Sequence, residues 1–129
     1  MVSVKPITNK VTHATVTETL ARLRAEVEAR GMTLFTTIDH SGAAKATGLE
    51  LLETKLVIFG NPQIWTPILH AAPLAGLDLP LKVLVREDRN RTCVSYTAPA
   101  ELATRYRLSD ELAAGLSGID ALTDAVVGR

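Results

Sequence analysis

Cysteine is nearly absent from this chain of 129 residues, and neither sign of charge is in excess. The single cysteine, Cys93, excludes an intramolecular disulfide and fits a reducing compartment. The 14 basic and 14 acidic residues give a formal net charge of zero. Proteins that bind nucleic acid or an anionic membrane surface normally carry a clustered basic excess, so we expect neither partner.

Long apolar runs and a targeting segment are also missing. No stretch approaches the roughly 18 consecutive apolar residues that cross a bilayer. Residues 1–6 lack the basic and then apolar order of a signal peptide. We therefore expect a cytoplasmic protein that does not enter a membrane.

Aromatic residues make up only 4% of the chain, yet its mean hydropathy is positive, at +0.16. The apolar content is mostly leucine, alanine and valine. Such a composition is unusual for a small soluble monomer and indicates a second apolar surface beside the core. The simplest way to bury that surface is a homodimer, which is the partner we expect.

The hydrophobic periodicity predicts one domain in which strands and helices are mixed. One helix runs from a capping box at Thr15 and Glu18 to Gly31, and another runs from Pro62 to residue 72. The segments 81–87 and 92–97 form an antiparallel hairpin joined by a polar turn. Further strands are predicted at 7–13, 34–38 and 55–60, and further helices at 41–48, 99–103, 109–116 and 119–127. The hairpin favours an α+β fold of two layers, with a mostly antiparallel sheet and helices packed on one face.

Asp39 and His40 follow the strand at 34–38 and form a first candidate site. A carboxylate beside an imidazole could orient a general base or supply metal ligands. The alternative is structural, in which Asp39 and Ser41 cap the short helix and His40 is a loop residue. Because neighbouring side chains usually diverge, we favour capping over catalysis and keep both interpretations.

The turn at Asn61 and Pro62 is the second candidate and the stronger one. It ends a buried strand and starts a helix, where free N–H groups attract anions and the Asn61 amide offers donors and an acceptor. Asn61 also fits the N-cap of that helix, so capping alone and capping with ligand binding both stay open. His70, on the same helix, is either a residue at the edge of the core or a ligand contact.

Metal and nucleophilic chemistry have little support in the sequence. His13, His40 and His70 are the only histidines, and none of their spacings matches a helix-based metal site. Cys93 lies in a strand beside apolar residues, as an inert buried cysteine does. We expect no metal site and no cofactor.

Several segments together resemble the DUF302 family of small bacterial and archaeal proteins. They are Phe-Thr-Thr-Ile-Asp-His at 35–40, Ala-Ala-Lys-Ala-Thr-Gly-Leu at 43–49, Ile-Phe-Gly-Asn-Pro at 58–62 and Leu-Asp-Leu-Pro at 77–80. The resemblance covers most of the chain and implies a compact α+β fold, often dimeric, with no established activity. It draws attention to Asp39, His40, Asn61 and Pro62 and supplies no catalytic residue. Trp65 departs from the family, in which a small residue is common there, and its indole would fill part of a pocket.

Three functions are consistent with these features. We favour a dimeric binding module whose pocket is formed by the Asp39–His40 turn, the Asn61–Pro62 turn and the Leu79–Pro80 segment, with an unidentified small molecule as ligand. The second hypothesis is an enzyme that uses His40 as general base, oriented by Asp39, with or without a metal. The third is a structural or interaction domain whose apolar surface docks a partner or a second copy.

Overall fold

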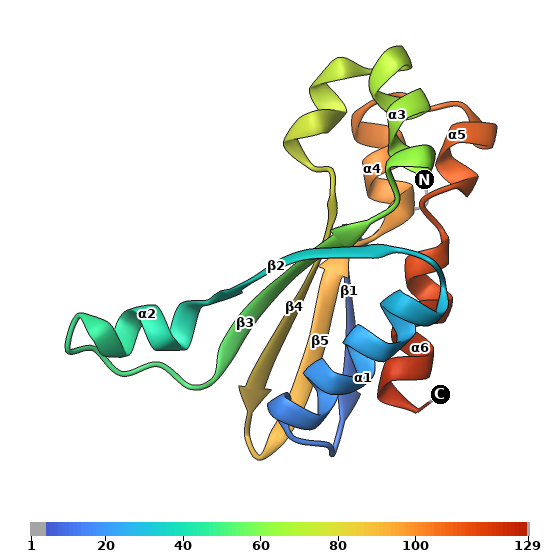
Figure 1. Cartoon of the computed structure of the whole chain (residues 1–129). Coiled ribbons are helices and arrows are strands. Elements are labelled where there is room, and N and C mark those ends of the chain that lie inside the picture. The colour runs from blue at the N-terminus through green and yellow to red at the C-terminus, as the bar shows by residue number, and fades with distance from the viewer. Residues whose placement is uncertain (1–4, 129) are drawn as a thin grey trace.

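A five-stranded sheet forms the centre of the computed structural model, which describes residues 5–128 (Figure 1). The strands are β1 (Ile7–Thr12), β2 (Thr33–Asp39), β3 (Thr54–Gly60), β4 (Leu81–Asp88) and β5 (Arg91–Thr97). Their order across the sheet is β1-β5-β4-β3-β2, and every neighbouring pair is antiparallel. The predicted α+β class and the predicted hairpin are confirmed.

The helices also follow the predicted order. They are α1 (Val16–Ala29), α2 (His40–Ala46), α3 (Pro62–Ala71), α4 (Pro99–Arg105), α5 (Asp110–Ala114) and α6 (Gly118–Val127), with a 3-10 helix, η1 (Pro73–Leu77), after α3. The capping box of α1 is present, because Thr15 Oγ1 accepts from Glu18 N at 3.0 Å and Glu18 Oε1 accepts from Thr15 N at 3.3 Å. The sequence did not predict η1, because five residues are too few to show a helical period.

The helices α1 and α6 cover one face of the sheet and enclose the main core (Figure 1). Alternation along β3 places Val57 and Phe59 on this covered face, where both side chains are buried. Leu23 of α1 and Leu122 of α6 belong to the same cluster and have no exposed surface. Burial of apolar area, worth about 25 cal/mol per Å², is the main force that holds these layers together.

A second and smaller core lies at one end of the sheet, where α3, η1, α4 and α5 form a helical lobe (Figure 1). Its buried members are Ile68, Ala75, Leu102 and Leu116. Asp78, directly after η1, accepts hydrogen bonds from Arg105 Nη1 at 2.9 Å and from the Tyr106 hydroxyl. These bonds fasten η1 to the C-terminal end of α4.

A buried lysine joins β1 to α6. Lys10 is 5% exposed, and its ammonium donates to Asp120 O at 2.9 Å and to Thr123 Oγ1 at 2.6 Å. Its third polar partner is Asp124 Oδ1, at 2.8 Å. The ring of Tyr96 lies 5.3 Å below the ammonium, in cation–π geometry. All three ammonium protons therefore have acceptors, so the buried charge is satisfied.

The outer ends of β2 and β3 extend beyond the main core as a projecting arm (Figure 1). We define the arm as residues 38–55, which contain α2 and the loop 47–53. Every residue of α2 is at least partly exposed, and so are Leu49, Leu51 and Leu52 in the loop. Within the described structure β2 is an edge strand that pairs with β3 alone. The arm therefore exposes apolar side chains that the rest of residues 5–128 leaves uncovered.

Candidate functional site

Asp39 lies where β2 passes into α2 and acts as the N-cap of that helix. Its Oδ1 accepts from Gly42 N at 2.9 Å and from Ser41 Oγ at 2.8 Å. Its Oδ2 lies 3.6 Å from Lys55 Nζ, on the neighbouring strand. The Gly42 amide, the Ser41 hydroxyl and the Lys55 ammonium hold the pKa of Asp39 below its ordinary value. Asp39 is thus ionised at neutral pH and already bound to three groups, so its capping role is confirmed.

His40 is the first residue of α2 and is exposed. The hydrogen bonds of Asp39 go to Ser41 and Gly42, and none found among residues 5–128 joins it to His40. The described residues also contain no group of three metal-ligating side chains. The orienting contact that a general-base role for His40 requires is therefore missing from this geometry.

Asn61 begins α3 in the same way. Its Oδ1 accepts from Gln63 N at 2.9 Å, which makes it the N-cap, and Pro62 takes the first helical position. Gly60 immediately before it has φ +156°, and a Cβ there would lie 2.7 Å from Trp65 Cζ3. The indole therefore lies directly over the end of β3, and its ring centroid is 5.6 Å from that of Phe35 in β2. Trp65 therefore fills the space beside the Gly60 backbone.

The two predicted turns do not meet within one chain. In the antiparallel pair of β2 and β3, Asp39 lies opposite Lys55, while Gly60 lies opposite Thr33. Six residues of strand therefore separate the Asp39 end from the Asn61 end, a distance of roughly 20 Å. A single intramolecular pocket that joins both turns is wrong, because the strands run in opposite directions and carry their carboxyl ends to opposite ends of the pair.

Part of the predicted pocket is nevertheless brought together. Leu81 pairs with Phe59, so the Leu79–Pro80 segment lies at the same end of the sheet as Asn61. The Leu79–Pro80 peptide bond is cis. His70 lies in the last turn of α3 and is exposed, which places it on the helical lobe rather than in a pocket with Asp39.

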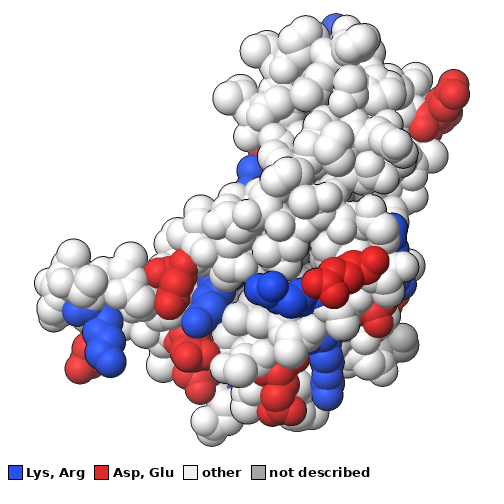
Figure 2. All heavy atoms as spheres, viewed as in Figure 1, with Lys and Arg blue, Asp and Glu red and all other residues white. Residues whose placement is uncertain are grey.

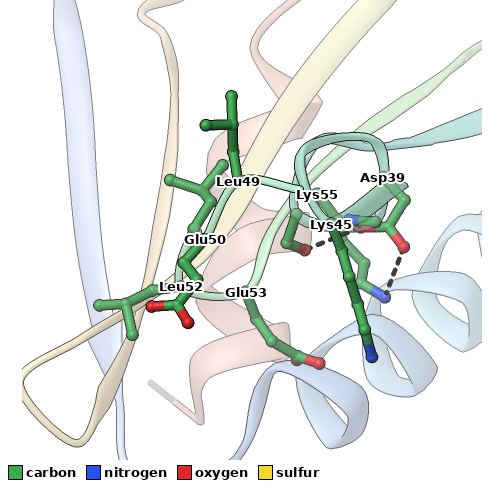
Figure 3. A pocket seen from close by; sticks show the side chains of 10 residues that line it. Asp39, Lys45, Leu49, Glu50, Leu52, Glu53 and Lys55 are labelled. Atoms are coloured by element: carbon green, nitrogen blue, oxygen red, sulfur yellow. Dashed lines mark hydrogen bonds and ion pairs between the residues drawn. The ribbon is translucent and has the colours of Figure 1, made fainter. Parts of the chain in front are cut away.

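An open groove of about 740 Å³ lies on the arm. Its lining contains the Asp39–Lys55 pair, Lys45 at the end of α2, and Glu50 and Glu53 from the loop. Figure 3 shows Asp39, Lys45, Glu53 and Lys55 on one side, whereas Leu49 and Leu52 point away from them. The groove thus combines two ammonium groups and three carboxylates with the Ser41 hydroxyl, which donates to Asp39, a carboxylate whose lowered pKa makes it a weak base. It is suited to binding rather than covalent catalysis.

Sequence reasoning identified Asp39 and missed the other charged residues of the groove. Lys45 ends α2, and Glu50 and Glu53 lie in a loop without a strand or helix period, so no pattern indicated that the three residues line one groove. A second hollow of about 240 Å³ between α1 and β2 also includes Asp39 and Lys55. Asp39 and Lys55 therefore line both hollows, and of these two residues the sequence had singled out only Asp39.

The chain matches a family model over residues 7–126, and that model is described as a domain of unknown function, DUF302. The chain belongs to the DUF302 family. A crystal structure of an uncharacterized conserved DUF302 protein from Bacillus stearothermophilus is similar over 95% of this chain and 96% of that one, with a TM-score of 0.80 and 19% identity. This DUF302 protein therefore shares the fold of that structure.

Two curated relatives are named fluoride-specific ion channel FluC 1, one from Brucella suis biovar 1 (strain 1330) and one from Brucella abortus biovar 1 (strain 9-941). Each is 40% identical to the DUF302 chain over 114 residues, which is 88% of this chain. The chain spans 42% and 40% of their lengths, so the channel name belongs to proteins more than twice as long. No helix in residues 5–128 is long and apolar enough to cross a membrane.

Proposed function

We propose that this DUF302 protein works as a homodimer and that the arm and the edge strand β2 are its self-association element. The observation that carries the proposal is the amount of exposed surface. The chain of 13.8 kDa exposes 7798 Å². A compact monomer of this mass exposes about 6,600 Å². A standard interface covers about 800 Å² of each partner, so the excess is of the size that a stable dimer buries.

The edge of β2 supports the same proposal. Unpaired N–H and C=O groups on an exposed strand are a template for pairing, and proteins usually protect them with lysine or proline. The segment Thr33–Asp39 contains neither residue, and Phe35 and Ile38 are both exposed on it. A bulge can also protect an edge, and the irregularity between Leu34 and Thr36 is of this kind, but it lies at one end and leaves the strand from Thr36 onward regular.

The distribution of charge adds a third argument. Figure 2 shows that lysine, arginine, aspartate and glutamate gather over the lower part of the molecule and the tip of the arm. The helical lobe and the surface between it and the arm are largely free of charge in this view. Interface cores are depleted of charged residues, so this uncharged surface is suited to contact with a second copy.

Sedimentation equilibrium tests the homodimer directly. We expect a dimer at micromolar concentration, and a substitution of Ile38→Lys should weaken it at least about tenfold by placing a charge on the edge strand. Ile7 is a matched control, because it is 46% exposed on the opposite edge strand and Ile38 is 41% exposed. A wild-type monomer, or equal effects of Ile38→Lys and Ile7→Lys, would contradict the proposal.

A second candidate function is the binding of a small polar molecule in the groove of the arm. It is favoured by the Lys45 and Lys55 ammonium groups, which lie on one side of the groove with the carboxylates of Asp39 and Glu53. Native mass spectrometry of protein purified from its own cells would show a retained ligand as extra mass. That mass should disappear in Lys55→Met and remain in Lys5→Met, which removes a lysine outside the groove lining.

A further inference from the structure

Two sets of exposed leucines lie at opposite ends of the β2–β3 pair. At the arm end, Leu49 is 66% exposed, and Leu51 and Leu52 are exposed by more than half. At the other end, in η1 of the helical lobe, Leu74 is 72% exposed and Leu77 is 77% exposed. Exposed apolar groups that cluster in this way mark contact surfaces. Within one chain these two sets cannot cover each other, because six residues of paired strand separate their ends.

Two-fold symmetry brings the two sets together between two copies. A symmetric homodimer uses the same patch on both partners, and two edge strands related by a two-fold axis run antiparallel. If the axis passes the middle of Thr33–Asp39, at Thr36, then Asp39 lies opposite Thr33 of the partner subunit. The partner's Thr33 is itself paired with its own Gly60, where α3 begins. The arm of one copy thus lies at the helical lobe of the other.

We infer that two copies exchange arms, so that the leucines of each arm pack against η1 and α3 of the second copy. This inference rests on the proposed homodimer and specifies its geometry. The surface offered by the lobe matches the arm in character, because it is largely uncharged (Figure 2) and carries Ile64, Leu74 and Leu77 exposed. The three loop leucines of the arm are then buried as the core leucines are.

Arm exchange also reunites the two candidate turns. In this register two strand spacings of about 4.8 Å separate Asp39 of one copy from Gly60 of the partner subunit, a total of about 10 Å. Within one chain the corresponding separation is roughly 20 Å. Polar groups at the arm and at the Asn61 turn therefore become walls of one site only when two copies are joined. The groove on the arm is the half of that site that a single chain contains.

Cysteine cross-linking between differently substituted copies tests the register. In a Cys93→Ser background, Leu51→Cys and Leu77→Cys are prepared separately, mixed and oxidised. We expect a cross-linked dimer from the mixture and little from either variant alone, because each contact joins an arm to a lobe. Leu51→Cys mixed with Arg22→Cys, which lies exposed on α1, is the control and should stay unlinked.

Charge substitution provides a second test that needs no disulfide geometry. Leu51→Glu and Leu77→Lys should each weaken self-association at least about tenfold, since either one buries a charge against leucines. A mixture of the two should form a heterodimer, because the glutamate of one copy meets the lysine of the other.

The outcomes separate the inference from the proposal on which it rests. Cross-linking specific to positions 51 and 77, or selective heterodimer formation, supports arm exchange. A stable dimer with neither result, or with equal cross-linking at Arg22→Cys, overturns arm exchange and leaves the homodimer standing. A monomer at micromolar concentration overturns both.

Discussion

The main core and the arm are built from the same apolar residue types and differ in what covers them. Leu23 and Leu122 have no exposed surface between the sheet and the helices, whereas Leu49 and Leu52 in the arm are 66% and 59% exposed. Within residues 5–128, α1 and α6 form a covering layer for one face of the sheet, and no element covers the arm in this way. Apolar residues therefore hold the fold together in the first region and offer contact surface in the second.

The largest expected effect separates these two roles. Phe59→Ala removes a fully buried ring from the main core and should lower the free energy of unfolding by about 3–5 kcal/mol. Leu52→Ala removes a side chain that is mostly exposed in one copy, so in dilute solution it should change stability by less than about 0.5 kcal/mol. Urea denaturation of the two variants measures both values.

Protein concentration sharpens this test. If the arm is covered by a second copy, the cost of Leu52→Ala should grow as the protein concentration rises, because dimerisation adds to stability by mass action. The cost of Phe59→Ala should not change in this way. A loss from Leu52→Ala that is independent of concentration and as large as that from Phe59→Ala would abolish the distinction between core and arm.

A smaller effect is expected at the polar contact inside the main core. Lys10→Ala leaves Asp120 O and Thr123 Oγ1 without their buried donor and should cost about 2–4 kcal/mol. Lys10→Met keeps the aliphatic packing over Tyr96 and should cost less than Lys10→Ala. The difference in urea midpoint between the two variants measures the packing contribution. Equal losses would mean that packing of the side chain contributes little.

The sequence predicted the helices and strands of this fold more fully than the side-chain contacts between them. Thr15 and Glu18 marked the start of α1, and Asn61 with Pro62 marked the start of α3, because capping chemistry is local and visible in a few residues. Lys10 shows the limit of such reasoning. Its place in an alternating strand could not reveal that Asp124 and Thr123 from α6, more than 110 residues away, would surround its ammonium.

The candidate site shows the same limit. Asp39 and Asn61 were both placed correctly at strand ends, yet a common pocket required β2 and β3 to bring those ends together. The antiparallel pairing separates them. The residues of one strand do not predict whether its neighbour runs parallel or antiparallel to it. The groove residues Glu50 and Glu53 were missed for a related reason, since an irregular loop has no period from which facing side chains can be read.

Acid should affect the helical lobe through Asp78. The hydrogen bond from Tyr106 lowers the pKa of Asp78 below its ordinary value of 3.8, although burial alone would raise it. The Arg105 guanidinium lowers this pKa further. A lowered pKa means that the stabilisation is complete above 3.8 and is lost as the pH falls through the folded-state value. Urea midpoints measured from neutral pH into the acid range should therefore fall less steeply for Asp78→Asn than for the wild type. Identical slopes would show that the ionised Asp78 carboxylate does not stabilise the attachment of η1 to α4.

The smallest effect expected at a polar contact distinguishes capping from association at the Asn61 turn. Asn61→Ala removes the acceptor of the Gln63 N–H and should cost about 1 kcal/mol of stability, whereas Asn61→Ser keeps a capping oxygen and should cost less. Neither change removes an apolar contact of the arm, so both variants should dimerise with wild-type affinity in sedimentation equilibrium. A different outcome is that Asn61→Ser dimerises as strongly as the wild type while Asn61→Ala does not. The cap of α3 would then help to hold the surface that contacts the arm of the second copy. In that case the lobe and the arm are not independent regions.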